Sequence, residues 1–236
     1  MNQIDIGSRL SAAASCVEGG RTVWDVGCDH GKLSLYLIQT GRAKRIIATD
    51  INEKPLQKAV DLFRSHSLED RAVFFTADGL DNAPEGEDIS HIVIAGMGGN
   101  TIASILSSSD LPERCGATLV LLPAQREETL RQFLFGGGYR ILSEEAVEEN
   151  GKYYVCLTCV YDGVKRIADL LTVFAGQPAG SAAVGYLEKR LGQMRNVMRG
   201  VARDEKDRYA RAIEEGERIL AGMKNGGGSR PDTPDR

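Results

Sequence analysis

The fold is decided by the stretch TVWDVGCDHG at residues 22–31, where an apolar run ends in an acidic turn with two glycines. Gly27 and Gly31 let the backbone approach a ligand closely at the carboxyl end of a strand, and the following helix presents unpaired N–H groups there. The turn is not Gly-x-Gly-x-x-Gly, because Asp29 stands at its middle position. Since Asp25 and Asp29 would repel a pyrophosphate, the turn favours a ligand with a cationic centre or with hydroxyl and ammonium groups.

Outward from this stretch, short apolar runs alternate with helical patterns as far as residue 135. Each run is nearly continuous in Val, Ile and Leu, as expected for parallel strands buried on both faces. Five strand–helix units therefore predict a parallel sheet with right-handed crossovers. The predicted strands are Thr22–Val26, Arg45–Thr49, Ala72–Thr76, His91–Ala95 and Thr118–Leu122. The predicted helices cover 4–17, Lys32–Gln39, Pro55–His66, Thr101–Ser107 and Glu127–Phe135.

The end of this region departs from a plain doubly wound sheet. Two strands, Tyr139–Val147 and Lys152–Tyr161, follow each other without a helix and are joined by a turn at Asn150-Gly151. The fold class is therefore α/β, with a Rossmann-like sheet of seven strands whose last two form an antiparallel hairpin. This is the layout of class I methyltransferases.

Apolar residues at helical spacing return after the hairpin and predict two helices, packed antiparallel from about residue 181 to 224. Residues 226–234 are polar and rich in Gly and Pro, which predicts disorder. We expect a methyltransferase domain at 1–165, a coiled-coil-like helical hairpin at 166–224 and a disordered tail at 225–236.

Acidic residues follow the second and third predicted strands, and a glycine-rich loop follows the fourth. Asp50 is placed to bind the two ribose hydroxyls of a nucleoside, and Asp78 to accept its adenine amino group. Taken alone, an Asp at a strand end is an ordinary turn residue or cap in the alternative interpretation. The three glycines of Gly96–Gly99 expose backbone to a cofactor and a substrate, while a tight turn with Asn100 as helix cap is the alternative. S-adenosylmethionine (SAM) has a sulfonium and an ammonium group, so it fits this set better than a nicotinamide dinucleotide.

Two strings together resemble one family: DVGCDH at residues 25–30 and IVIAGMGG at 92–99. They are similar to bacterial tRNA (adenine-N1)-methyltransferases of the TrmK family, which methylate N1 of adenine 22 in the D-arm of tRNA. The resemblance runs from Arg9 to Tyr153, and the helical appendage matches in kind. This chain has Gly-Lys-Leu-Ser at 31–34 where the family usually has Ala-Tyr-Leu-Pro. It has Leu-Pro-Ala-Gln at 122–125 where Leu-Gln-Pro-Asn is common.

The resemblance implies methyl transfer by in-line displacement, for which the enzyme aligns the adenine N1, the methyl group and the sulfur. Asp29 and His30 are the catalytic candidates: either accepts a hydrogen bond from the adenine amine or holds the amino-acid part of the cofactor. The candidate cofactor-binding residues are Asp25, Gly27, Asp29, His30, Asp50, Ile51, Asp78, Gly79, Ala95, Gly96, Met97 and Gly98. The candidate RNA-binding residues are Arg9, Arg126, Lys189, Arg190, Arg195 and Arg199. For each basic residue, a solvated surface position is the competing interpretation.

Charge and cysteine content limit the alternatives. The net charge is −4, with +3 from Tyr186 onward, which makes the C-terminal segment the better candidate for a polyanion such as tRNA.

Five scattered cysteines suggest the cytoplasm, and Cys156 and Cys159 point to opposite faces of one strand, so we expect no metal. No apolar run is long enough to span a membrane. We expect a monomer or weak dimer. A methyltransferase of a small molecule or protein, or a non-catalytic RNA-binding module, remains the alternative.

Overall fold

The computed structural model describes residues 3–225 and shows one seven-stranded sheet in the order β3-β2-β1-β4-β5-β7-β6. Strands β1 to β5 are parallel, and β7 is antiparallel to both β5 and β6, so the predicted closing hairpin is confirmed. The strands are β1 Gly20–Val26, β2 Ala43–Asp50, β3 Ala72–Thr76, β4 Ile89–Ala95, β5 Thr118–Leu122, β6 Tyr139–Glu149 and β7 Lys152–Tyr161.

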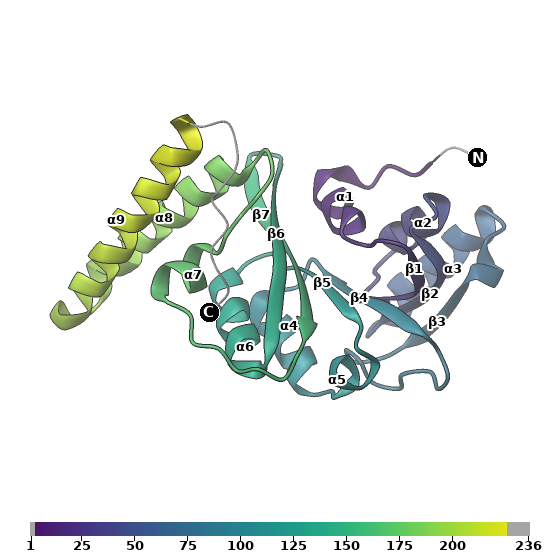
Figure 1. Cartoon of the computed structure of the whole chain (residues 1–236). Helices are drawn as coiled ribbons and strands as arrows, with labels where there is room; N and C mark the ends of the chain where they lie inside the picture. Colours follow the sequence, from purple (N-terminus) through teal and green to yellow (C-terminus); the bar gives the residue numbers. More distant parts are fainter. Residues whose placement is uncertain (1–2, 226–236) are drawn as a thin grey trace.

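Helices cover both faces of the sheet (Figure 1). One face packs against α1 to α3, and the other against α4 to α6 together with the start of α8 (Ala183–Gly200). Their bounds are α1 Gly7–Ser15, α2 Lys32–Gln39, α3 Glu53–Ser65, α4 Gly99–Ser107, α5 Leu111–Cys115 and α6 Glu127–Gly137, with a 3-10 turn at Glu69–Arg71. The helix predicted for 4–17 is shorter than expected, beginning at Gly7. The short helix α5 was not predicted, since five residues give no helical period.

The central strands are buried on both faces because their apolar sequence is uninterrupted. Neighbouring residues of β1 point to opposite cores: Val23 contacts the α1–α3 side and Trp24 the α4–α6 side, and both are fully buried. The same alternation separates Cys156 from Cys159 on β7, as predicted. All five cysteines are free. Among residues 3–225, no cluster of His, Cys, Asp and Glu side chains is arranged to hold a metal ion.

The C-terminal helices are α7 Leu170–Ala175, α8 Ala183–Gly200 and α9 Arg203–Asn225. Helices α8 and α9 lie antiparallel and project beyond the β6–β7 edge of the sheet (Figure 1), so the predicted helical pair is present. Their seam has its own apolar cluster, in which Gly216 allows Leu191 to approach the α9 backbone. Helix α7, which was not predicted, completes this cluster with Leu171 and Phe174.

Within the described range, no helix is both long enough and apolar enough to cross a bilayer. The predicted tail at 225–236 lies outside the described residues, apart from Asn225.

Candidate active site

The candidate cofactor residues lie at one edge of the sheet, where β1 to β4 end. β1 lies between β2 and β4, and the chain order of the strands reverses direction on its two sides. In open α/β sheets, ligands bind at this switch point, outside the carboxyl ends of the strands. The register pairs Val26 with Thr49 on β2 and with Ile94 on β4, so the three following loops start side by side.

The β1–α2 loop contains three residues with positive φ angles. Gly27 and Gly31 have φ angles of +70° and +69°, and Asp29, at +49°, holds a conformation that side chains other than glycine rarely adopt. Gly31 is the N-cap of α2 and provides no side-chain cap, so the first N–H groups of the helix face this edge. Strain of this kind is typical of functional loops.

Asp25, near the end of β1, contacts the first turn of α2, which follows this loop. Its carboxylate is buried, and Ser34 Oγ, in the first turn of α2, donates a hydrogen bond of 2.6 Å to Asp25 Oδ2. Burial raises the pKa of Asp25 to about 6. Enclosed by protein, Asp25 holds α2 against β1 through this hydrogen bond. Ser34, part of the departure from the family string, provides this contact.

The raised pKa makes stability depend on pH in a defined direction. Because the folded pKa exceeds the usual value of 3.8, Asp25 favours the folded state at low pH, and this contribution is lost as pH rises through about 6. Between pH 4 and pH 7, wild-type protein should lose on the order of 2 kcal/mol of unfolding free energy relative to Asp25→Asn, which cannot ionise. Urea unfolding of both proteins at the two pH values measures this. Equal pH dependence in the two proteins would show that Asp25 titrates normally.

Asp50 joins two loops at the end of β2. Its Oδ1 accepts a hydrogen bond from the N–H of Asn52 (2.8 Å), and its Oδ2 accepts one from the N–H of Asp29 (3.2 Å). Each carboxylate oxygen keeps a further lone pair for a ligand hydroxyl. Beside it, Ile51 is 64% exposed, and Asp78 is exposed at the end of β3. This edge of the sheet therefore has two carboxylates, Asp50 and Asp78, that can accept hydrogen bonds from hydroxyl or amine groups. The exposed apolar side chain of Ile51 lies beside Asp50.

Asp29 and His30 are the most open acidic and basic groups of the first loop. Their side chains are 72% and 43% exposed, with Asp29 Oδ1 3.5 Å from His30 Nε2. Lys58 Nζ, on α3, lies 3.3 Å from the same ring nitrogen. Sequence reasoning missed Lys58, because nothing in the spacing of α3 indicates which residue faces the β1–α2 loop.

The β4–α4 loop is fixed to its neighbours by backbone hydrogen bonds. Gly96 N–H donates to the carbonyl of Leu122 (3.0 Å), and Gly99 N–H to that of Gln125 (2.8 Å). In return, Ala124 N–H donates to the carbonyl of Met97 (2.8 Å). The Met97 methyl lies against the Cα of Gly27, so the loop also contacts the β1–α2 loop.

In the alternative interpretation of this loop, a tight turn into a helix capped by Asn100, the cap is wrong. Gly98 is the N-cap of α4 and provides no side-chain cap, while Asn100 lies inside the helix. Gln125, which replaces the usual amide pair after the fifth strand, lies next to Gly98. The side-chain amide therefore stands at a different position in the sequence than in the family string, but Gln125 still lies at the edge of the sheet where β4 ends.

Comparison with known proteins agrees with this geometry. Residues 6–157 match a family described as "Methyltransferase domain". The chain is 30% identical over 178 residues to the tRNA (adenine(22)-N(1))-methyltransferase of Bacillus subtilis, covering 72% of this chain and 74% of the relative. The chain belongs to the tRNA (adenine(22)-N(1))-methyltransferase family.

Solved structures of similar proteins extend the match to the C-terminal helices. One is a candidate tRNA (m1A22) methyltransferase of Streptococcus pneumoniae in complex with SAM, with 30% identity and a TM-score of 0.75, covering 90% of this chain and 98% of that one. Another is a Rossmann-superfamily protein of Streptococcus agalactiae, with 26% identity and a TM-score of 0.77, covering 92% and 98%. The predictions of a TrmK-type fold and of SAM-dependent methyl transfer are confirmed at the level of the family.

The candidate RNA-binding residues of this TrmK-family chain lie in different surroundings. Arg126 is 66% exposed and, with a φ of +63°, is the last residue of the loop that contacts Gly98 and Gly99. Arg9 is half-buried and lies over the Tyr154 ring, 3.8 Å from a Glu149 carboxylate oxygen. Arg126 is thus exposed, with a Glu128 carboxylate oxygen 3.8 Å from its Nη1, whereas Arg9 is engaged within the fold.

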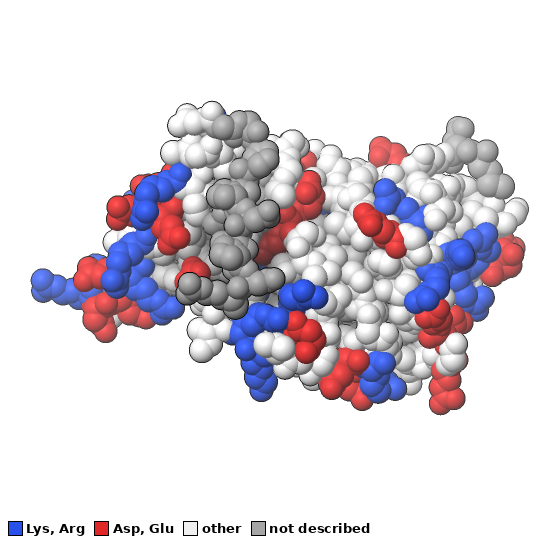
Figure 2. Space-filling model, in the orientation of Figure 1, with Lys and Arg blue, Asp and Glu red and all other residues white. Residues whose placement is uncertain are grey.

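The prediction that Arg190 contacts RNA is wrong. Its side chain is 3% exposed, and its guanidinium is held by the carboxylates of Glu127 and Glu128. Lys189 is also engaged, since its Nζ donates to the carbonyl of Tyr153 (2.8 Å). Arg195 pairs with Glu217 across the helical hairpin, and Arg199 is exposed. Figure 2 shows Lys and Arg side chains interspersed with acidic ones on the projecting helices.

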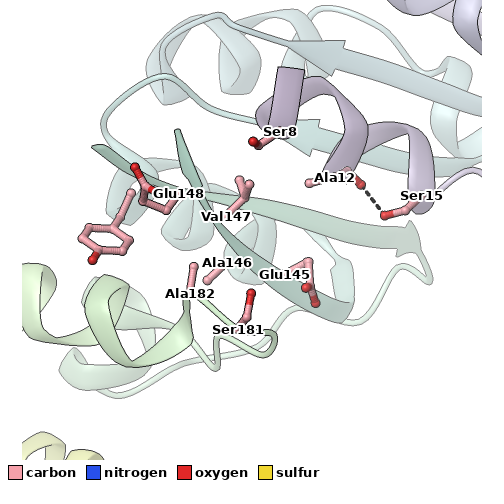
Figure 3. A pocket seen from close by; sticks show the side chains of 10 residues that line it. Ser8, Ala12, Ser15, Glu145, Ala146, Val147, Glu148, Ser181 and Ala182 are labelled. Atoms are coloured by element: carbon pink, nitrogen blue, oxygen red, sulfur yellow. Dashed lines mark hydrogen bonds between the residues drawn. The ribbon is translucent and has the colours of Figure 1, made fainter. Parts of the chain in front are cut away.

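A cavity of about 550 Å³ opens elsewhere, between α1, β6 and the start of α8. Figure 3 shows Ser8 and Ser15 of α1 on one side of it and Glu145 of β6 on the other. Because β6 is the edge strand farthest from β2 and β3, this cavity is separate from the candidate cofactor site. Its carboxylates make it unsuited to a phosphate.

Proposed function

We propose that this chain transfers a methyl group from SAM to N1 of an adenine in tRNA, at position 22 in the D-arm. One observation carries the proposal: Asp29, Asp50 and the Gly96–Gly99 loop meet at the sheet's switch point. The chain bearing them is 30% identical to the Bacillus subtilis enzyme. A tRNA substrate places the reaction in the cytoplasm.

The residues at this edge fit the cofactor. In the proposal, the free lone pairs of Asp50 accept the two ribose hydroxyls, Ile51 contacts the adenine face, and Asp78 accepts the adenine amine. The backbone of the β1–α2 loop, at Gly27, receives the amino-acid part. When bound, SAM supplies an electrophilic methyl group on a cationic sulfur.

The main work of the chain is alignment, because the N1 lone pair of adenine needs no activating base. A nucleophile held in line, about 3–3.5 Å from the carbon that it attacks, gains much of the rate enhancement from orientation alone. Attack leaves the adenine cationic, and its exocyclic amine then carries an acidic proton. The exposed Asp29 carboxylate accepts a hydrogen bond from that amine, with His30 beside it.

The acceptor adenine must be unpaired or pulled from its stack before N1 can be reached. The bare backbone of Gly96–Gly99 leaves room for such a base, and Arg126 at the neighbouring loop contacts a phosphate. In this proposal, residues 1–165 perform the transfer, and the helices within 166–224 hold the tRNA through exposed basic residues such as Arg195 and Arg199.

Labelled SAM and unmodified bulk tRNA test this function, with nucleoside analysis of the product. We expect the label in 1-methyladenosine, and Asp29→Ala should reduce it at least about tenfold, as is typical for loss of a positioned polar group. Transfer to a protein or small molecule instead, or SAM binding without transfer to any acceptor, would overturn the tRNA assignment. Those two results correspond to another methyltransferase and to a binding module, respectively.

A further inference from the structure

Arg190 connects the projecting helix α8 to the first turn of α6. Its Nη1 donates to Glu127 Oε2 (3.2 Å), its Nη2 to Glu128 Oε2 (2.6 Å), and its Nε to the carbonyl of Phe174 (2.8 Å). The guanidinium also lies over the Phe174 ring, 4.5 Å from its centroid. Since both Arg190 and Glu127 are 3% exposed, this is a buried ion pair with fixed geometry.

Glu127 and Glu128 directly follow the loop that borders the active site. This loop, residues 123–126, ends at Arg126 in a left-handed conformation and then enters α6. Arg126 Nη1 lies 3.8 Å from Glu128 Oε1, so Glu128 lies between the exposed Arg126 and the buried Arg190. A shift of Glu127 and Glu128 would therefore move the end of this loop.

The loop at 123–126 in turn fixes the Gly96–Gly99 loop. Two backbone hydrogen bonds of 2.8 Å cross between them, from Ala124 to Met97 and from Gly99 to Gln125. The Gly99 Cα lies directly against the Arg126 carbonyl. A continuous set of contacts thus runs from α8 to the backbone at which the acceptor base is proposed to lie.

We infer that Arg190 is a positioning residue for methyl transfer: through Glu127 and Glu128 it holds the 123–126 loop, and through that loop the Gly96–Gly99 backbone. The inference rests on the proposed function. It gives α8 a role beyond docking tRNA, since the helix also sets the geometry of the transfer site.

A second buried cluster offers a matched control. Arg131 of α6 makes two hydrogen bonds of 2.9 Å to Glu144 on β6, and its Nη2 donates to Tyr186 Oη on α8 (3.0 Å). This cluster also joins α8 to the sheet, but it contacts the middle of α6 instead of its first turn. Tyr186→Phe removes one of these hydrogen bonds and leaves the 123–126 loop untouched.

Arg190→Lys keeps the charge but cannot form the forked contacts to both carboxylates. We expect kcat for tRNA methylation to fall about tenfold or more, because a misplacement near 1 Å is enough for such a loss. The KM for tRNA should stay within about twofold, as expected when an interaction acts only on the transition state. Hydrogen exchange of the Gly99 and Ala124 amides should be faster in Arg190→Lys and unchanged in Tyr186→Phe.

Wild-type kcat and exchange in Arg190→Lys, or a rise in KM alone, would overturn the inference. Equal losses in Tyr186→Phe would also contradict it, since general anchoring of α8 would then be the cause. If Arg190→Lys does not fold, Glu128→Gln weakens one acceptor and leaves the Glu127 pair intact, and the same changes are expected at smaller size. An inactive wild-type protein would overturn the proposed function, while amide exchange would still decide the inference.

Discussion

Replacing Gly99 with alanine is expected to reduce methyl transfer by about a hundredfold or more. A Cβ at this position would overlap the carbonyl oxygen of Arg126 and approach that of Gln125. Both are backbone atoms, so the overlap cannot be relieved by turning a side chain. The Gly96–Gly99 and 123–126 loops must then separate, and the hydrogen bond from Gly99 N–H to Gln125 is lost. Steady-state transfer to tRNA measures the effect.

Gly192→Ala is the matched control for this substitution. Gly192 also lies in a helix, but nothing lies within 4 Å of a Cβ added there. Alanine should stabilise α8 there by up to about 1 kcal/mol and leave transfer unchanged. A Gly99→Ala protein with wild-type activity would show that the close contact between the two loops is not needed for catalysis.

Removing the carboxylate at the end of β2 is expected to weaken SAM binding by about a hundredfold or more in Asp50→Ala. Two hydrogen bonds to ribose hydroxyls would be lost, each contributing about 1.5–3 kcal/mol when the acceptor is charged. The N–H groups of Asp29 and Asn52 would also lose their acceptor, so the first loop would be less fixed. Isothermal titration with SAM or its demethylated product gives the affinity directly.

Asp88→Ala serves as the comparison for Asp50→Ala. Asp88 is an exposed carboxylate paired with Arg21, and it lies beside the start of β4, at the opposite edge of the sheet. Its removal changes the net charge by the same amount, and SAM affinity should not change. Equal weakening in the two variants would point to a general electrostatic effect in place of a ribose contact.

The sequence predicted the sheet well because its strands are buried on both faces. Val, Ile and Leu are nearly continuous in β1 and β4, and that pattern has few other structural solutions. The hairpin was equally clear, since Asn150 and Gly151 adopt the positive φ angles that their turn requires. Helix α7 was missed because six residues are too few to show a period.

The part of the candidate site that is made by loops after strands was predictable from the sequence. The contacts that side chains make from distant elements were not. Gly27, Asp50 and Gly96–Gly99 follow strands, so strand order alone brings them together. Arg190 shows the limit: a basic residue on a charged helix resembles a surface residue. Its carboxylate partners are 62 and 63 residues away in sequence, and only the packing of α8 on α6 buries it. Ser34 was seen only as a departure from the family string, although it holds Asp25.

The central claim, methylation of adenine 22, is tested most directly with two tRNA transcripts that differ at that position alone. One carries adenine at position 22 and the other guanine, and both are incubated with labelled SAM and the full chain. We predict label as 1-methyladenosine in the first transcript and none in the second. Equal labelling of both transcripts, or labelling of neither by a protein shown to bind SAM, would contradict the account.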